Sequence, residues 1–118
     1  MLRNTKLYID DIAEALRNVI EFTAGLSQAE FSSDKRTRDA TIRNLEIVGE
    51  AAKKVPEAIR LLAGDIPWRR LAGLRDILIH DYFGIDAVIL WDIVSNEVPV
   101  LLPKIDLLRE QLASTVSA

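Results

Sequence analysis

The chain has 118 residues, of which 49% are hydrophobic and 28% are charged; this suits one packed domain and is too apolar for a disordered chain. It contains no cysteine, which excludes disulfides and thiolate metal sites and fits a reducing compartment. We see no signal peptide and no membrane-spanning stretch, so we expect a cytoplasmic protein that has no contact with a membrane.

The net charge of −3 argues against a general nucleic-acid binder, but the charge is unevenly distributed. Residues 35–75 carry ten Lys and Arg against five Asp and Glu, whereas the rest of the chain carries five against thirteen. A basic middle suits contacts with phosphate or with an acidic partner, although a solvated helix surface gives the same pattern.

Apolar residues at helical spacing predict the elements of the first half of the chain. The first helix covers about residues 4–24 and stops at Gly25, and residues 27–33 form a connector whose Phe31 enters the core. Asp34 caps a second helix that ends before Pro56, and a short helix follows over residues 56–63.

The second half begins with a helix that runs from near Pro67 towards Gly84. Asp86 caps a fourth segment, residues 95–96 interrupt it, and a last helix covers about residues 98–113. Pro103 is awkward inside that helix, so we expect a start later than residue 98. No segment alternates with period two, which predicts an all-α fold: an antiparallel bundle of four main helices with an extra short helix.

Residues 68–84 contain the only histidine, His80, and an arginine in an unexpected place. On one straight helix Arg75 shares its side with Leu71, Leu78 and Tyr82, and a permanently charged guanidinium on an apolar stripe needs a partner or a function. The five residues from Arg75 to His80 turn a helix by about 140°. Either the helix bends near His80, or the two groups meet through a second copy of the chain.

The second predicted helix carries a candidate partner for such a cation. Glu46 and Glu50 are four residues apart and share a face; they are either solvated or orient a catalytic or interface cation. Gly49 is costly within a helix and therefore indicates a close approach by another helix or by a substrate. Trp68 and Trp91 are expected to anchor the core or an interface.

Few reaction classes fit this set of residues. A single histidine without cysteine argues against a metal centre, and the spacing of the candidate carboxylates does not demand a magnesium site; these are Asp76, Asp81 and Asp86. A trio of His80, Arg75 and Tyr82 suits metal-free RNA cleavage, in which histidine moves protons and arginine holds the phosphate. A structural or surface histidine is the alternative.

The pattern Arg75-x4-His80-x-Tyr82 resembles the signature of HEPN domains, and specifically of HepT-type toxins of bacteria and archaea. Three flanking blocks resemble the same family in the same order: residues 43–51, residues 66–68 followed by residues 73–75, and residues 91–94. The likeness extends from about residue 7 to residue 112.

This resemblance implies a single HEPN domain over residues 1–118, folded as a four-helix bundle and paired as a homodimer. The two copies of Arg75 and His80 would line a cleft at the dimer interface and act as an endoribonuclease without a cofactor. The implied partner is a small nucleotidyltransferase antitoxin, which would silence the toxin by transferring AMP to Tyr82. Arg69 and Arg70 are candidate RNA contacts, with a solvated face as the alternative.

The chain departs from the family directly after the motif arginine, where Asn is frequent and this sequence has Asp76. Its carboxylate could pair with Arg75 or Arg69, or repel an RNA phosphate. Two other functions therefore stay open beside the toxin ribonuclease. One is a HEPN-type dimer that binds nucleotide or a nucleotidyltransferase without cutting RNA, and the other is a helical interaction domain with a structural His80.

Overall fold

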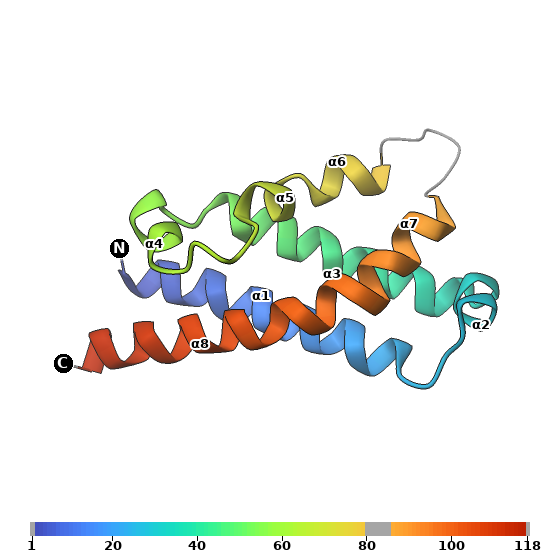
Figure 1. Ribbon diagram of the computed structural model, residues 1–118, viewed down its shortest axis with the longest axis horizontal. Coiled ribbons are helices and arrows are strands. Elements are labelled where there is room, and N and C mark those ends of the chain that lie inside the picture. The colour runs from blue at the N-terminus through green and yellow to red at the C-terminus, as the bar shows by residue number, and fades with distance from the viewer. Residues whose placement is uncertain (1, 80–85, 118) are drawn as a thin grey trace.

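The computed structural model describes residues 2–79 and 86–117, and it confirms the all-α prediction, because this part contains helices and no strand (Figure 1). The helices are α1 (Leu2–Thr23), α2 (Gln28–Ser33), α3 (Lys35–Lys53), α4 (Glu57–Leu62), α5 (Trp68–Ala72), α6 (Leu74–Ile79), α7 (Ala87–Asp92), a π-helix η1 (Ile93–Glu97) and α8 (Val98–Ser117). None of the described helices is long and apolar enough to cross a membrane.

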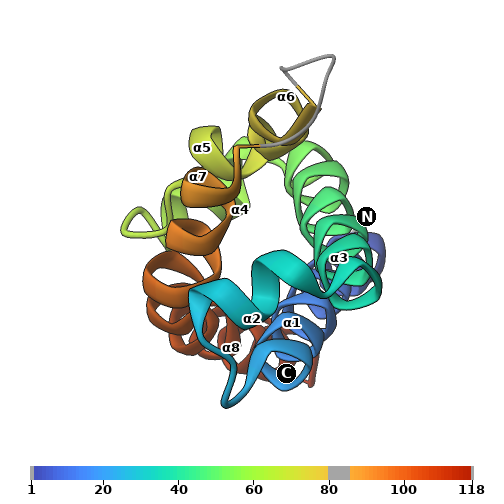
Figure 2. The same ribbon diagram turned by 90° about the vertical axis from the view of Figure 1, so that its right-hand side faces the viewer.

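The three long helices run side by side along a body of 48 × 29 × 21 Å (Figure 1). Seen along that body, α3 and α8 flank α1, and α5 and α6 lie against α3 (Figure 2). The segment that carries Arg75 is thus supported mainly by α3.

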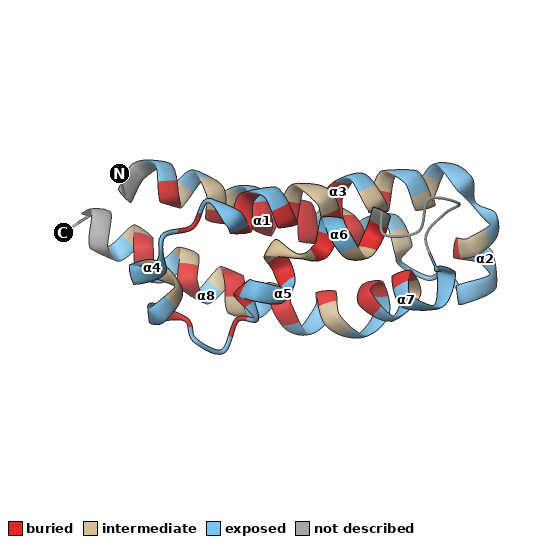
Figure 3. Cartoon of the chain, turned by 90° about the horizontal axis from the view of Figure 1, so that it is seen from above, coloured by how far each residue is buried: buried red, intermediate tan, exposed pale blue. Residues whose placement is uncertain are grey.

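The core lies between these helices and follows the predicted stripes (Figure 3). Each long helix buries residues three or four apart: Ile12, Leu16 and Val19 in α1, Leu45, Val48 and Ala52 in α3, and Ile105, Leu108 and Leu112 in α8. Three apolar residues of α1 are instead exposed, namely Leu7 (52%), Ile20 (36%) and Phe22 (40%).

The predicted connector over residues 27–33 is wrong, because α2 forms there. The Ser27 hydroxyl accepts from the Glu30 backbone N–H at 3.1 Å, and the Glu30 carboxylate accepts from the Ser27 N–H at 2.9 Å. This reciprocal pair satisfies two backbone donors and holds the pKa of Glu30 below its ordinary value. Phe31 is buried as predicted, with its ring centroid 5.3 Å from that of Trp91.

Asp34 caps α3 as predicted. Its carboxylate accepts from the Thr37 backbone N–H at 3.1 Å and from the Thr37 hydroxyl at 2.7 Å. The same hydrogen bonds lower the pKa of Asp34, because they favour the ionised carboxylate. The other predicted ends also hold: α1 stops before Gly25 in the left-handed region (φ 77°), and α3 stops before Pro56.

The interruption predicted at residues 95–96 and the late start of the last helix are both wrong. The chain stays helical from Ala87 to Ser117, and residues 93–97 form a wider π turn in place of a break. Pro99 and Pro103 both lie on the exposed side. Carbonyl groups that lose their helical donor there can bind water, so proline is tolerated.

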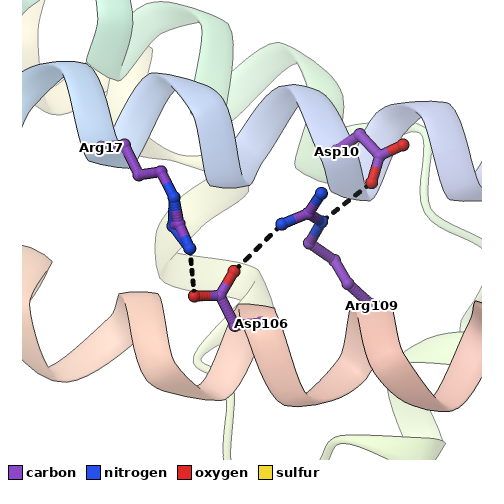
Figure 4. Close-up of polar contacts among 4 residues, drawn as sticks. All are labelled: Asp10, Arg17, Asp106 and Arg109. Atoms are coloured by element: carbon purple, nitrogen blue, oxygen red, sulfur yellow. Dashed lines mark hydrogen bonds and ion pairs between the residues drawn. The ribbon is translucent and has the colours of Figure 1, made fainter.

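Helices α1 and α8 are joined by a chain of four alternating charges (Figure 4). Arg109 donates to Asp10 at 2.9 Å and to Asp106 at 3.2 Å, and Asp106 also accepts from Arg17 at 2.7 Å. These contacts raise the pKa of Arg109, chiefly through the hydrogen bond to Asp10. The network borders a hollow of about 430 Å³ between the two helices.

Replacing Arg109 by Gln should lower the free energy of unfolding by about 1 kcal/mol, because two carboxylates lose a shared partner. The difference from the wild type should shrink in 1 M NaCl, where ion pairs are screened. Urea unfolding at low and high salt measures both effects. Lys6→Gln is the control, since Lys6 borders the same hollow without an ion pair among the described residues. An equal loss in both variants would contradict this account.

Gly49 allows α3 to approach the segment that carries Arg75. A Cβ atom at this position would lie 3.1 Å from the Leu71 carbonyl oxygen of α5 and 3.6 Å from the Leu74 Cβ of α6. The first distance is tighter than ordinary packing, and its partner is a backbone atom that cannot rotate away. The predicted close approach at Gly49 is therefore confirmed as a contact between helices.

Gly49→Ala should lower the free energy of unfolding by about 1 kcal/mol, because overpacking outweighs the better helix propensity of alanine. Gly73→Ala is the matched control: its Cβ would lie 3.5 Å from the nearest atom, and its φ of −89° suits any residue. That variant should keep or slightly raise stability. Thermal melts of the two proteins compare them, and a stabilised Gly49→Ala would refute the close contact.

Candidate functional site

The segment from Pro67 to Ile79 is not one straight helix. It forms α5 and α6, which are separated at Gly73 with φ −89° and ψ 0°. The angles between side chains on one continuous helix therefore do not apply to residues on opposite sides of Gly73. The buried face of α6 is formed by Leu74 and Leu78, which are one turn apart.

Arg75 consequently does not lie on an apolar stripe, and that prediction is wrong. Its side chain is 53% exposed at the surface. It nevertheless has a partner, because its Nη1 atom lies 3.6 Å from the Glu50 Oε1 atom of α3. Gly49 precedes Glu50, so the close helix contact places this carboxylate beside the arginine.

Glu50 faces a second cation that the sequence did not single out. The same Oε1 atom lies 3.8 Å from Lys53 Nζ, one turn further along α3. Glu46, the other candidate support, makes no ion pair among the described residues. Arg75, Glu50 and Lys53 thus form a surface cluster with one excess positive charge, which we call the Arg75 cluster.

The two candidate RNA contacts differ in their surroundings. Arg70 forms a two-pronged ion pair with Glu97 of η1, at 2.5 Å from Nε and 2.7 Å from Nη2. The pKa of Arg70 is raised, first by this hydrogen bond. Arg69 is exposed and has no ion pair within the described part of the chain. Arg70 therefore links α5 to η1. The guanidinium N–H donors of Arg69 form no ion pair with the described residues, so they stay available for a ligand.

Asp76 lies beside Arg75 in sequence but pairs with neither Arg75 nor Arg69 in the described structure. It borders an open, largely apolar hollow of about 680 Å³, together with Trp68, Arg69 and Ile77. Trp68 is a core anchor, as expected: it is 7% exposed and donates from its indole N–H to the Ala63 carbonyl at 3.1 Å.

His80, Asp81 and Tyr82 lie outside the described residues, so the geometry between Arg75 and His80 stays a prediction. Helix α6 is described up to Ile79, the residue directly before His80. Among the described residues, no three carboxylates come together in a way that could hold a metal ion.

Comparison of the sequence with known proteins assigns the chain to a family. Residues 12–108 match the family described as ribonuclease HepT-like. The chain belongs to the HepT-like ribonuclease family. Over 110 residues it is 46% identical to a protein of Thermococcus cleftensis named "Probable ribonuclease HepT", covering 93% of this chain and 100% of that one.

Two other relatives of the HepT-like chain carry the name "Putative RNase". One, from Methanocaldococcus jannaschii, is 42% identical over 89% of this chain and 96% of its own length. The other, from Caldanaerobacter subterraneus, is 36% identical over 85% of this chain and 89% of its own length. No solved structure matches the chain.

Arg70→Gln in this HepT-like protein should lower the free energy of unfolding by about 1 kcal/mol, because a two-pronged ion pair is lost and Glu97 stays without a partner. Arg69→Gln should leave stability unchanged and serves as the control. Chemical unfolding of both variants tests the difference in role. Equal stability of the two proteins would show that the Arg70–Glu97 pair contributes nothing measurable.

Proposed function

We propose that this HepT-like protein is a metal-independent endoribonuclease that acts as the toxin of a toxin–antitoxin pair. The observation that carries the proposal is its similarity to a relative named as a ribonuclease, at 46% identity across 93% of the chain. The exposed guanidinium of Arg75, five residues before the only histidine, supports it.

The reaction is a transesterification within the RNA strand. His80 takes the proton from the ribose 2′-hydroxyl, and the 2′-oxygen attacks the adjacent phosphorus. The bond from phosphorus to the 5′-oxygen breaks, and that oxygen receives a proton from an imidazolium. The products are a 2′,3′-cyclic phosphate and a 5′-hydroxyl. Arg75 donates to the phosphate oxygens and offsets the charge that grows on them in the transition state.

A homodimer of HEPN four-helix bundles suits this chemistry, because one imidazole acts as the base while another acts as the acid. Two copies of Arg75 and His80 in a shared cleft would supply both. The geometry of a straight α-helix favours the same arrangement, because Arg75 and His80 would point about 140° apart on it.

Control by a nucleotidyltransferase antitoxin completes the proposal. The phenolic oxygen of Tyr82 loses its proton to solvent and attacks the α-phosphorus of ATP, pyrophosphate leaves, and AMP stays esterified to that oxygen. The bulk and negative charge of AMP beside Arg75 and His80 would exclude an RNA phosphate.

A HEPN-type dimer that binds nucleotide or a nucleotidyltransferase without cutting RNA is the second candidate. Asp76 favours it, because this carboxylate stands beside Arg75 and makes no ion pair with it in the described structure. A negative charge there opposes the approach of phosphate.

The deciding experiment is cleavage of a mixed RNA pool in EDTA by the wild type and by His80→Ala, each checked by intact mass. We expect cyclic-phosphate ends from the wild type and a rate lower by a factor of about 100 or more for His80→Ala, because proton transfer is lost. Arg75→Ala should lose cleavage by a similar factor.

Expression of the wild type alone should slow growth, and His80→Ala should restore it. Intact RNA after incubation with an unmodified wild type would overturn the ribonuclease and favour the binding dimer. Intact RNA with protein heavier by AMP would identify a silenced toxin, and Tyr82→Phe would then test the site of modification.

A further inference from the structure

We infer that Glu50 is a positioning residue that orients Arg75 for the scissile phosphate. The inference rests on the proposed ribonuclease activity and assigns a function to the Arg75 cluster. Glu50 comes from α3 and Arg75 from α6, so the contact joins two elements that are held together by the close approach at Gly49.

The geometry leaves Arg75 able to bind substrate. The nearest contact of Glu50 with Arg75 is to the Nη1 atom at 3.6 Å, which is longer than a hydrogen bond, so the carboxylate attracts the guanidinium without taking up its N–H donors. An arginine carries five N–H donors and binds phosphate best through two parallel ones. With one edge turned towards α3, the remaining donors can face a phosphate at the surface.

Orientation matters here because Arg75 is 53% exposed and has a long side chain. A free arginine at the surface samples many rotamers, and fixing it during catalysis costs side-chain entropy. A carboxylate that restricts these rotamers before RNA arrives removes part of that cost. The ion pair itself adds little to stability, because water screens the attraction between exposed charges.

Lys53 keeps Glu50 from repelling the substrate. The Glu50 Oε1 atom that faces Arg75 also lies 3.8 Å from Lys53 Nζ, so two positive charges surround one negative charge. The Arg75 cluster therefore stays attractive to phosphate, although less so than it would be without Glu50. Neutralising the Glu50 carboxylate should therefore strengthen RNA binding and slow catalysis.

Steady-state kinetics of Glu50→Gln on a fluorogenic RNA oligonucleotide test the inference. Loss of the negative charge should lower KM about threefold, because the cluster attracts phosphate more strongly. Loss of orientation should lower kcat about tenfold, because a misplaced Arg75 stabilises the transition state less well. Glu46→Gln removes the same charge one turn earlier on α3, makes no ion pair in the described structure, and should change neither constant markedly.

A lower KM with an unchanged or higher kcat would show that Glu50 merely obstructs phosphate, which would overturn the positioning role. Unchanged constants in Glu50→Gln, or equal changes in Glu46→Gln, would overturn it as well. The melting temperature of Glu50→Gln should stay near that of the wild type, because the pair is exposed.

A second measurement does not depend on cleavage. The heteronuclear NOE of the Arg75 Nε–H group should be higher in the wild type and in Glu46→Gln than in Glu50→Gln, since only the last releases the side chain. Equal NOE values in all three proteins would refute positioning by Glu50. Absence of cleavage by the wild type, with the NOE difference present, would overturn the ribonuclease proposal and leave the orientation of Arg75 by Glu50 standing.

Discussion

The contact between α3 and the α5–α6 segment at Gly49 is the constraint on which the candidate site depends. A missing side chain lets the Leu71 carbonyl come close enough that a Cβ would lie 3.1 Å away. Glu50 follows immediately and so reaches Arg75 across the same contact. Glycine destabilises α3 relative to alanine, but it allows the close helix packing. That packing brings the Glu50 carboxylate and the motif arginine together.

Two ion pairs at the surface complete the attachment of this segment. Arg70 is tied to Glu97 of η1, and Arg75 is tied more loosely to Glu50 of α3. Both pairs are partly exposed, so the buried faces of Leu71, Leu74 and Leu78 supply most of the stability. The two ion pairs instead orient the exposed arginine side chains. A functional site at the surface needs this orientation, and hydrophobic burial cannot provide it.

The sequence predicted α1 and α3 well because an apolar stripe and strong end signals at Gly25, Asp34 and Pro56 agree there. It missed α2, although the Ser27–Glu30 pair is a local signal, because six residues are too few to show a period. The prediction of one straight helix failed at Gly73, because tertiary packing decides whether the chain continues straight there. The sequence placed Glu50 among the candidates but could not choose between Glu50 and Glu46, because the choice depends on how two helices approach each other.

The π turn of η1 holds one residue more than an α-helical path of the same length needs. A chain shortened by one residue within η1 could close that turn as a regular α-helix, so Leu90 and Trp91 would keep the sides of the helix on which they lie. The same deletion within α7 or α8, where no residue is spare, would rotate the residues before it by about 100° relative to the rest of the helix. The π turn is therefore the place where this long helix tolerates the loss of a single residue, and the exposed stretch around Gly64 can accept single insertions.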